Sequence, residues 1–396
     1  MAPAAPLRLV VDLTELRLGS AGKGGFYGIA RVVAELAQAL PPLPAPLLPP
    51  VAVVHRRWRR TFQPVVLEAA SVADLDLLRL QPLAAAWPLG PGLLLSAARP
   101  RLLARYGPAL ARHQLQLVPL IHDLFPLVDV HDRPSARFRR RFLADNRRVL
   151  AQAPLVLANS HCTAAALQQG VAQGWWPRLP PVAVLPLAHE CRPSCRQPVT
   201  AALPAEPYLV LVGPRLGRRN LQVVLAALRW LRQTGQPCPL VVLAGAERSR
   251  TRRALAAAEQ APIRDRLRLV STPDQATLEA LLRGALALVM PSFLEGWGLP
   301  AAEALWLGTP VLAADIAVMH EVCGDLARYF PPDQPQQLAR LMLQVLQSPA
   351  EQRAWAARVA AAHPRLRSWH QVATELRHHL LPLLTATALP SPWRAG

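Results

Sequence analysis

Two glutamates separated by seven residues form the most chemically informative pattern in this chain. Glu295 lies in PSFLEGWG, and Glu303 follows in PAAEAL. Gly296 and Gly298 suit a sharp turn or the close approach of a ligand to the backbone. Pro300 suits the first turn of a helix, whose N-terminal N–H groups and partial positive charge favour a phosphate. The alternative is a Gly-rich turn before a surface helix that carries one ordinary glutamate.

A second candidate phosphate site follows the apolar run Tyr208–Val212. The sequence continues as GPRLGRRN and then becomes helical in pattern. The guanidinium groups of Arg218 and Arg219 can bind phosphate oxygens in bidentate fashion. Strand, glycine loop and helix in this order predict a cationic loop at the carboxyl end of a strand. Solvated loop arginines are the alternative.

The string EGWGLPAAE resembles the Glu-x7-Glu signature of retaining glycosyltransferases of family 4, which have the GT-B architecture. In that family the first glutamate holds hydroxyls of the donor sugar and the second binds the ribose of the nucleotide. The resemblance implies these roles for Glu295 and Glu303. Loop N–H groups that face the sugar and the diphosphate would be those of Gly296, Trp297, Gly298 and Leu299. The family usually has Phe where this chain has Trp297.

Other segments resemble the same family. The loop GPRLGRRN is similar to the family's loop that ends in a basic pair and Asn, so the resemblance implies contacts with the donor diphosphate for Gly213, Arg218, Arg219 and Asn220. After VAVLPL the family usually has Gly-Val, whereas this chain has Ala188 and His189.

Two candidate residues lie in the first half of the chain. His122 follows an apolar run, and strand ends are where ligands bind in open α/β sheets. The string HDLFP resembles the family's loop in which the histidine approaches the sugar and the bond being broken. Gly28 begins GIAR, which is similar to the family's Gly-Ile-x-Arg loop over the interdomain cleft. The alternative for His122 is a purely structural histidine, and the alternative for Gly28 is a flexible loop before a helix.

The chain of 396 residues exceeds one ordinary core, and strand–loop–helix patterns occur in both halves. With the resemblance, this predicts an α/β fold of two Rossmann-like domains facing a cleft. We expect an acceptor domain at 1–190, a Pro-rich linker at 191–207 and a nucleotide-sugar domain at 208–367. Residues 368–396 would form a helix that crosses back to the first domain, and a tail.

The net charge of +19 comes almost entirely from arginine, because Lys23 is the only lysine. This composition is typical of a biased, GC-rich genome, although basic proteins also associate with anionic surfaces. The cluster HRRWRR at 55–60 could contact an anionic membrane peripherally, and solvated arginines explain it equally well. No uninterrupted apolar run reaches about 18 residues. We therefore expect a cytoplasmic protein, peripheral at the inner membrane face if it contacts lipid.

The resemblance implies retaining transfer of a hexosyl unit from a nucleotide diphosphate sugar, with mannose as the leading sugar. The expected acceptor is a glycan or lipid-linked glycan in cell-surface polysaccharide synthesis. His122, Arg218, Arg219 and Glu295 are the expected catalytic residues. We expect no metal and no cofactor, since arginines and a helix dipole can stabilise the leaving diphosphate. A sugar-nucleotide epimerase of the same architecture is one alternative. A non-catalytic surface or nucleic-acid binder is the other, but it leaves the motif spacing unexplained, and no nucleic-acid partner is expected.

Overall fold

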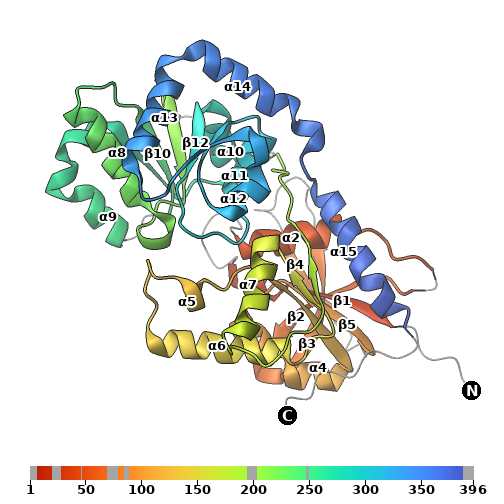
Figure 1. Ribbon diagram of the computed structural model, residues 1–396. Coiled ribbons are helices and arrows are strands. Elements are labelled where there is room, and N and C mark those ends of the chain that lie inside the picture. Colours follow the sequence, from red (N-terminus) through yellow and green to blue (C-terminus); the bar gives the residue numbers. More distant parts are fainter. Residues whose placement is uncertain are drawn as a thin grey trace, which may run out of the picture. The chain divides into compact units, whose positions relative to one another are not determined.

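The computed structural model describes residues 7–19, 28–45, 47–68, 79–83, 89–193, 203–246 and 249–386. The chain forms two compact units (Figure 1). Unit 1 comprises Met1–Val128, Pro134–Leu187 and Ser368–Gly396, and unit 2 comprises Asp129–Arg133 and Ala188–Arg367. Part of the predicted 191–207 linker lies outside the described residues, as does most of the glycine-rich stretch before Gly28. The predicted domain bounds stay predictions.

Unit 1 is built on an eight-stranded sheet in the order β4-β3-β2-β1-β5-β6-β7-β8. β2 and β3 pair in antiparallel fashion, as do β3 and β4, and the remaining pairs are parallel. β5 is buried along its whole length, as expected for a strand covered on both faces. The strands are β1 Arg8–Asp12, β2 Val51–Arg56, β3 Thr61–Glu68, β4 Arg79–Pro82, β5 Gly92–Ser96, β6 Leu115–Ile121, β7 Val156–Ala158 and β8 Val182–Val184.

The helices of unit 1 begin and end largely at residues that suit caps and turns. Ser160 caps α7 by accepting a hydrogen bond from the Thr163 backbone, and Ser368 forms a capping box with Gln371 at the start of α15. α15 packs against α2, so the last helix of the chain belongs to the core of unit 1. The helices are α1 Thr14–Gly19, α2 Ile29–Ala39, α3 Pro100–Leu103, α4 Gly107–His113, α5 Phe125–Val128, α6 Ala136–Leu150, α7 His161–Ala172 and α15 Trp369–Leu384.

Unit 2 contains a six-stranded parallel sheet in the order β11-β10-β9-β12-β13-β14. Strand order reverses between β9 and β12, because the chain adds strands outward in both directions from this pair. Ligands bind open α/β sheets at such a switch point, beyond the carboxyl ends of the strands. The strands are β9 Tyr208–Val212, β10 Leu240–Gly245, β11 Leu267–Ser271, β12 Ala287–Met290, β13 Val311–Ala314 and β14 Ala327–Phe330.

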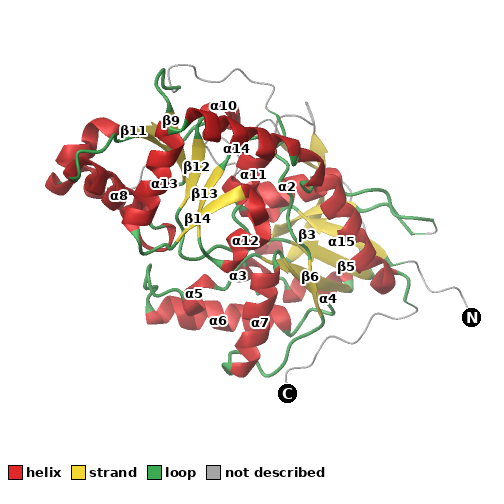
Figure 2. Cartoon of the chain, turned by 45° about the horizontal axis from the view of Figure 1, so that its top comes forward, coloured by secondary structure: helices red, strands yellow, loops and turns green. Residues whose placement is uncertain are grey.

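Helices surround the strands of unit 2 (Figure 2). They bury the apolar sheet, whose central strands β12 and β13 have no exposed residue. The helices are α8 Leu221–Gln233, α9 Ser249–Ala256, α10 Gln275–Gly284, α11 Leu299–Trp306, α12 Ala317–Cys323, α13 Pro335–Gln347 and α14 Pro349–Ala361, with short 3-10 turns at η4 Gly217–Arg219, η5 Ala258–Arg266, η6 Gly324–Leu326 and η7 His363–Arg365. The predicted α/β class with two units is confirmed.

No helix among the described residues has the length and apolar character needed to cross a membrane. The basic cluster at 55–60 spans the end of β2 and the 3-10 turn η1 Arg57–Arg59. Trp58 in this turn is 92% exposed. Contact of this turn with an anionic membrane stays a prediction.

Candidate functional site

The loop after β9 adopts a backbone conformation that its sequence favours. Gly213 follows the strand directly with φ 72°, and its N–H donates to the Ala244 carbonyl at 2.8 Å. Gly217 opens the 3-10 turn with φ 68°. Asn220 has φ 54° and precedes α8, a position that asparagine tolerates better than most side chains. This loop therefore places Arg218 and Arg219 at the carboxyl edge of the unit 2 sheet.

Hydrogen bonds hold this loop against the loop that follows β12. Asn220 is buried, and its amide donates to the Pro291 carbonyl at 3.0 Å. The Phe293 N–H donates to the Arg218 carbonyl at 2.9 Å. The Arg218 guanidinium in turn donates to the Leu294 carbonyl at 2.8 Å. The two loops at the switch point form one connected structure.

Glu295 lies at the centre of this structure, between the two arginines. Its carboxylate is 3.5 Å from Arg218 Nη1 and 3.2 Å from Arg219 Nε, and its side chain is 7% exposed. Ser292 Oγ donates to Glu295 Oε1 at 2.8 Å. One buried carboxylate thus faces two guanidinium groups, so this cluster has a net positive charge. Such an arrangement can exchange the carboxylate for an incoming phosphate, because both bind a guanidinium through paired oxygens.

Gly298 sets the start of α11. It is the N-cap residue with φ 101°, and a Cβ at this position would lie 2.5 Å from Met319 Cε. The positive φ, more than this contact with the flexible end of a methionine, favours glycine here. Gly296 and Trp297 are buried beside it, and Glu303 is buried further along α11 at 5% exposure. Leu299, the first residue of α11, is partly buried.

The two candidates of unit 1 lie at a strand end and a helix start. His122 follows β6, and its Nε2 donates to the Ala97 carbonyl at 2.8 Å, which leaves Nδ1 as the acceptor nitrogen. Burial lowers the pKa of His122, so the ring is neutral near pH 7. Gly28 is the N-cap residue of α2 with φ 60°, and a Cβ there would meet nothing within 4 Å.

The sequence did not reveal a buried carboxylate in unit 1, that of Asp12, which several side chains surround. Asp12, at the end of β1, accepts hydrogen bonds from Ser96 Oγ at 2.5 Å, Tyr106 OH at 2.8 Å and Thr14 Oγ1 at 2.5 Å. Burial is the largest influence and raises the pKa of Asp12, while these hydrogen bonds lower it. The only signal in the sequence was an Asp that ends an apolar run.

His189 is a further residue that the sequence reasoning did not select. Its Nε2 donates to the Val322 carbonyl at 2.9 Å, and its Nδ1 accepts from the Arg367 N–H at 3.1 Å. The His189 N–H donates to the Arg367 carbonyl at 2.8 Å. The ring also lies edge-on to Trp297, with centroids 6.0 Å apart. His189 thus links the two ends of the segment Ala188–Arg367 and contacts Trp297 in the loop that carries Glu295.

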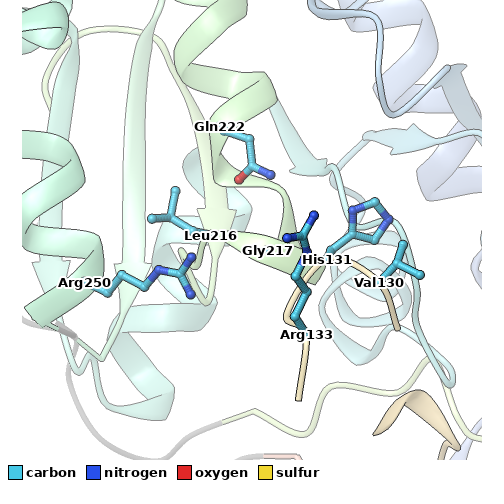
Figure 3. Close-up of a pocket in the computed structure, with 7 residues that line it drawn as sticks. All are labelled: Val130, His131, Arg133, Leu216, Gly217, Gln222 and Arg250. Atoms are coloured by element: carbon cyan, nitrogen blue, oxygen red, sulfur yellow. The ribbon is translucent and has the colours of Figure 1, made fainter. Parts of the chain in front are cut away.

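A cavity of about 480 Å³ lies next to the Arg218 loop (Figure 3). All of its lining residues belong to unit 2. They come from the segment Asp129–Arg133, from the loop after β9, and from the starts of α8 and α9. The lining residues are Val130, His131, Arg133, Leu216, Gly217, Gln222 and Arg250. None of the site residues predicted from the sequence lines this cavity.

Comparison with known proteins finds a family match within the second half of the chain. Residues 197–361 match the family described as Glycosyl transferases group 1. A D-inositol 3-phosphate glycosyltransferase of Jonesia denitrificans is 27% identical over 282 residues, which are 65% of this chain and 65% of that protein. An O-antigen chain mannosyltransferase of Salmonella typhimurium is 48% identical over 56 residues, 14% of this chain and 16% of that protein. The chain thus spans less than two thirds of the length of these relatives.

Solved structures share the fold over nearly the whole chain. A sucrose-phosphate synthase of Thermosynechococcus elongatus superimposes with a TM-score of 0.65 at 18% identity, covering 96% of this chain and all (100%) of that one. HepE of Anabaena, solved in complex with UDP-glucose, has a TM-score of 0.62 at 14% identity, with 95% and 100% covered. At such identities the likeness concerns the fold, which is the GT-B fold.

Proposed function

We propose that this chain, whose residues 197–361 match the family described as Glycosyl transferases group 1, transfers a glycosyl unit from a nucleotide diphosphate sugar to an acceptor hydroxyl. The observation that carries this proposal is the Glu295 cluster, with Arg218 and Arg219 beside it at the switch point of the unit 2 sheet. A diphosphate carries two or three negative charges near pH 7, and unit 2 presents paired guanidinium groups at this switch point. HepE, which shares the fold, was solved with a nucleotide sugar.

Arg218 and Arg219 would bind the diphosphate and stabilise the negative charge that grows on it as the glycosidic bond breaks. In the structure they pair with Glu295. Binding of the diphosphate would redirect the guanidinium groups, partly or wholly, from the carboxylate to the phosphate oxygens. The hydrogen bond from Arg218 to the Leu294 carbonyl can hold the side chain in place during this exchange.

Glu295, once released from the arginines, would accept hydrogen bonds from hydroxyls of the donor sugar. Its negative charge would also stabilise the positive charge that develops on the sugar ring. Retention of the anomeric configuration, with the acceptor attacking the face that the diphosphate leaves, is the stereochemistry we propose from the Glu-x7-Glu spacing. Glu303, buried on α11, would bind the ribose.

His122 would act as a neutral hydrogen-bond acceptor for the sugar. Because its Nε2 donates to Ala97, only Nδ1 can accept a hydrogen bond from a sugar hydroxyl. Burial lowers the pKa of the ring, which keeps Nδ1 unprotonated near neutral pH.

For the donor sugar we propose a hexose, with mannose first, and for the acceptor a glycan or lipid-linked glycan. The short stretch shared with an O-antigen chain mannosyltransferase supports this choice. The stretch covers 14% of this chain, so other hexoses are tested beside mannose.

Thermal unfolding with GDP, UDP, ADP and dTDP at matched concentrations tests donor binding. A ligand that binds only the folded protein raises Tm by mass action. We expect one diphosphate to raise Tm most, and Arg218→Ala or Glu303→Ala to abolish the shift. Arg283→Ala, at an exposed helix position paired with Glu279, is the control and should leave the shift unchanged. Absence of a shift with all four diphosphates would contradict the proposal.

Transfer itself is tested with the nucleotide sugars of the preferred base. Release of nucleoside diphosphate that depends on added acceptor indicates transfer, whereas a change of the sugar without any acceptor would indicate an epimerase.

A further inference from the structure

We propose that the cavity beside Gly217 binds a second anion, the phosphate or diphosphate group of the acceptor, separately from the donor diphosphate. The assignment of this anion to the acceptor rests on the proposed function. The existence of an anion site in the cavity does not, because it follows from the side chains that line it.

Two cationic side chains line the cavity, and the one carboxylate placed next to it among the described residues is that of Asp132, which lies against Gly217. Arg133 extends from the segment Asp129–Arg133, and Arg250 extends from the start of α9 toward the same space (Figure 3). Within the described part of the chain, neither guanidinium makes an ion pair or a hydrogen bond. Two arginines that converge on one cavity produce a positive potential that attracts phosphate. Gln222 adds an amide donor to the same wall.

The segment that carries Arg133 is largely exposed but makes specific contacts with unit 2. The His131 ring stacks on Phe293 with centroids 3.8 Å apart and an interplanar angle of 5°. Asp132 packs on Gly217 so closely that a Cβ at this glycine would lie 1.9 Å from Asp132 Oδ1. Arg133 itself has φ 44°, a conformation that non-glycine residues adopt when their surroundings enforce it. These contacts hold Arg133 at the rim of the cavity.

The cavity is distinct from the Glu295 cluster. Arg218 and Arg219 follow Gly217 directly in the chain, yet neither lines the cavity. They pair with Glu295, and Arg133 and Arg250 take no part in that cluster. The arginines proposed for the donor diphosphate and those of the cavity therefore form separate sets on adjacent parts of one loop.

The size and walls of the cavity indicate the class of ligand. A volume of about 480 Å³ exceeds the need of a single phosphate and lies in the range of small-molecule sites. Val130 and Leu216 give it an apolar part beside the arginines. A sugar phosphate or the diphosphate end of a lipid-linked saccharide combines these features.

The test uses inorganic pyrophosphate as the probe. Titration calorimetry is run at constant ionic strength, with the donor site filled by the nucleoside diphosphate that raises Tm most. We compare the wild-type chain with the double variant Arg133→Gln/Arg250→Gln. The control is Arg137→Gln/Arg253→Gln, which removes the same charge from α6 and α9 at exposed positions outside the cavity.

We expect pyrophosphate to bind the wild-type and control proteins alike and the cavity variant roughly a hundredfold more weakly, about tenfold for each arginine. Equal binding by the cavity and control variants, or no binding to the wild type, would overturn the proposal. Nucleoside diphosphate affinity, measured on the same proteins, should not change. If no nucleoside diphosphate binds, the proposed function fails, and pyrophosphate titrated alone still decides the cavity.

Competition then separates the two sources of the anion. A sugar 1-phosphate and an isoprenyl diphosphate in detergent micelles are each titrated against bound pyrophosphate. Stronger displacement by the first indicates a soluble phosphorylated acceptor, and stronger displacement by the second indicates a lipid-linked one. Failure of both to displace pyrophosphate would contradict the assignment to an acceptor.

Discussion

Replacing Glu295 by Gln should make nucleoside diphosphates bind more tightly while transfer becomes slower. The carboxylate now occupies Arg218 and Arg219 at 3.5 and 3.2 Å. A glutamine amide keeps the shape and still accepts from Ser292, but it no longer competes for the guanidinium groups through its charge. The two effects have opposite signs, so loss of folding cannot produce both.

The size of the effect follows from the charges. A phosphate held by the same arginines would lie roughly 6 Å from the carboxylate, where like charges repel by about 3 kcal/mol at an effective dielectric constant of about 20. Because Arg218 and Arg219 are 17% and 26% exposed, solvent screens part of this repulsion. Halving it leaves about 1.4 kcal/mol, or about tenfold in Kd. Loss of the charge that stabilises the sugar ring should slow transfer on the order of a hundredfold.

The assay is titration calorimetry with the preferred nucleoside diphosphate, followed by steady-state transfer. Ser292→Ala is the control, since it removes the hydrogen bond to Glu295 and keeps the charge, and its Kd should stay within about twofold. The tightening in Glu295→Gln should shrink at high salt. Unchanged or weaker binding by Glu295→Gln would show that these arginines serve the carboxylate alone, and the exchange mechanism would be refuted.

Further predictions concern the residues that position the site. Gly298→Ala should destabilise unit 2 by about 2 kcal/mol, because its φ of 101° lies beyond the left-handed region that side chains can enter. Gly235→Ala, at φ 65°, lies within that region and should cost about 1 kcal/mol. Equal urea midpoints for the two variants would contradict this. Asp12→Ala should lower the free energy of unfolding by about 3 kcal/mol, because it leaves buried donors without an acceptor, and Asp12→Asn should lower it by about half as much. Urea unfolding measures both values, and an Asp12→Ala variant as stable as the wild type would contradict the buried network. Burial lowers the pKa of His189 below its ordinary 6.5, so its stabilisation is complete above pH 6.5 and is lost as pH falls through the folded-state pKa. Between pH 6.5 and the folded-state pKa, the free energy of unfolding should therefore fall less steeply with decreasing pH in His189→Gln than in the wild type. Identical slopes in this range would exclude this role.

Local features of the site followed from the sequence because they depend on backbone chemistry. Gly213 and Gly298 have positive φ as the turn after a strand and the start of a helix require, and Asn220 precedes α8 in the left-handed region. The Arg218–Arg219 pair and Glu295 were each selected from short patterns. Each of these patterns involves only residues that are near one another in the chain, so the pattern can be recognised in a single sequence. Their predicted roles toward a ligand stay predictions.

The antiparallel strands β3 and β4 were not predicted from the sequence. Pro64 lies inside β3, and proline normally argues against a strand. The region 99–111 forms two helices, α3 and α4, separated by a turn before Gly107. Gly107 and Pro108 favour such a break, because they suit the start of a new helix better than the interior of one.

Only the tertiary structure decided which distant residues meet. Arg218 and Glu295 are joined because β9 and β12 are neighbours in the sheet, although they are far apart in the chain. Asp12 meets Ser96 because β1 pairs with β5, and Tyr106, at the start of α4, donates to the same carboxylate. The segment Asp129–Arg133 packs on unit 2, although the chain on both sides of it belongs to unit 1. Hydrophobic pattern and turn chemistry determine each element, but strand order determines contacts between elements, and a single sequence does not encode that order locally.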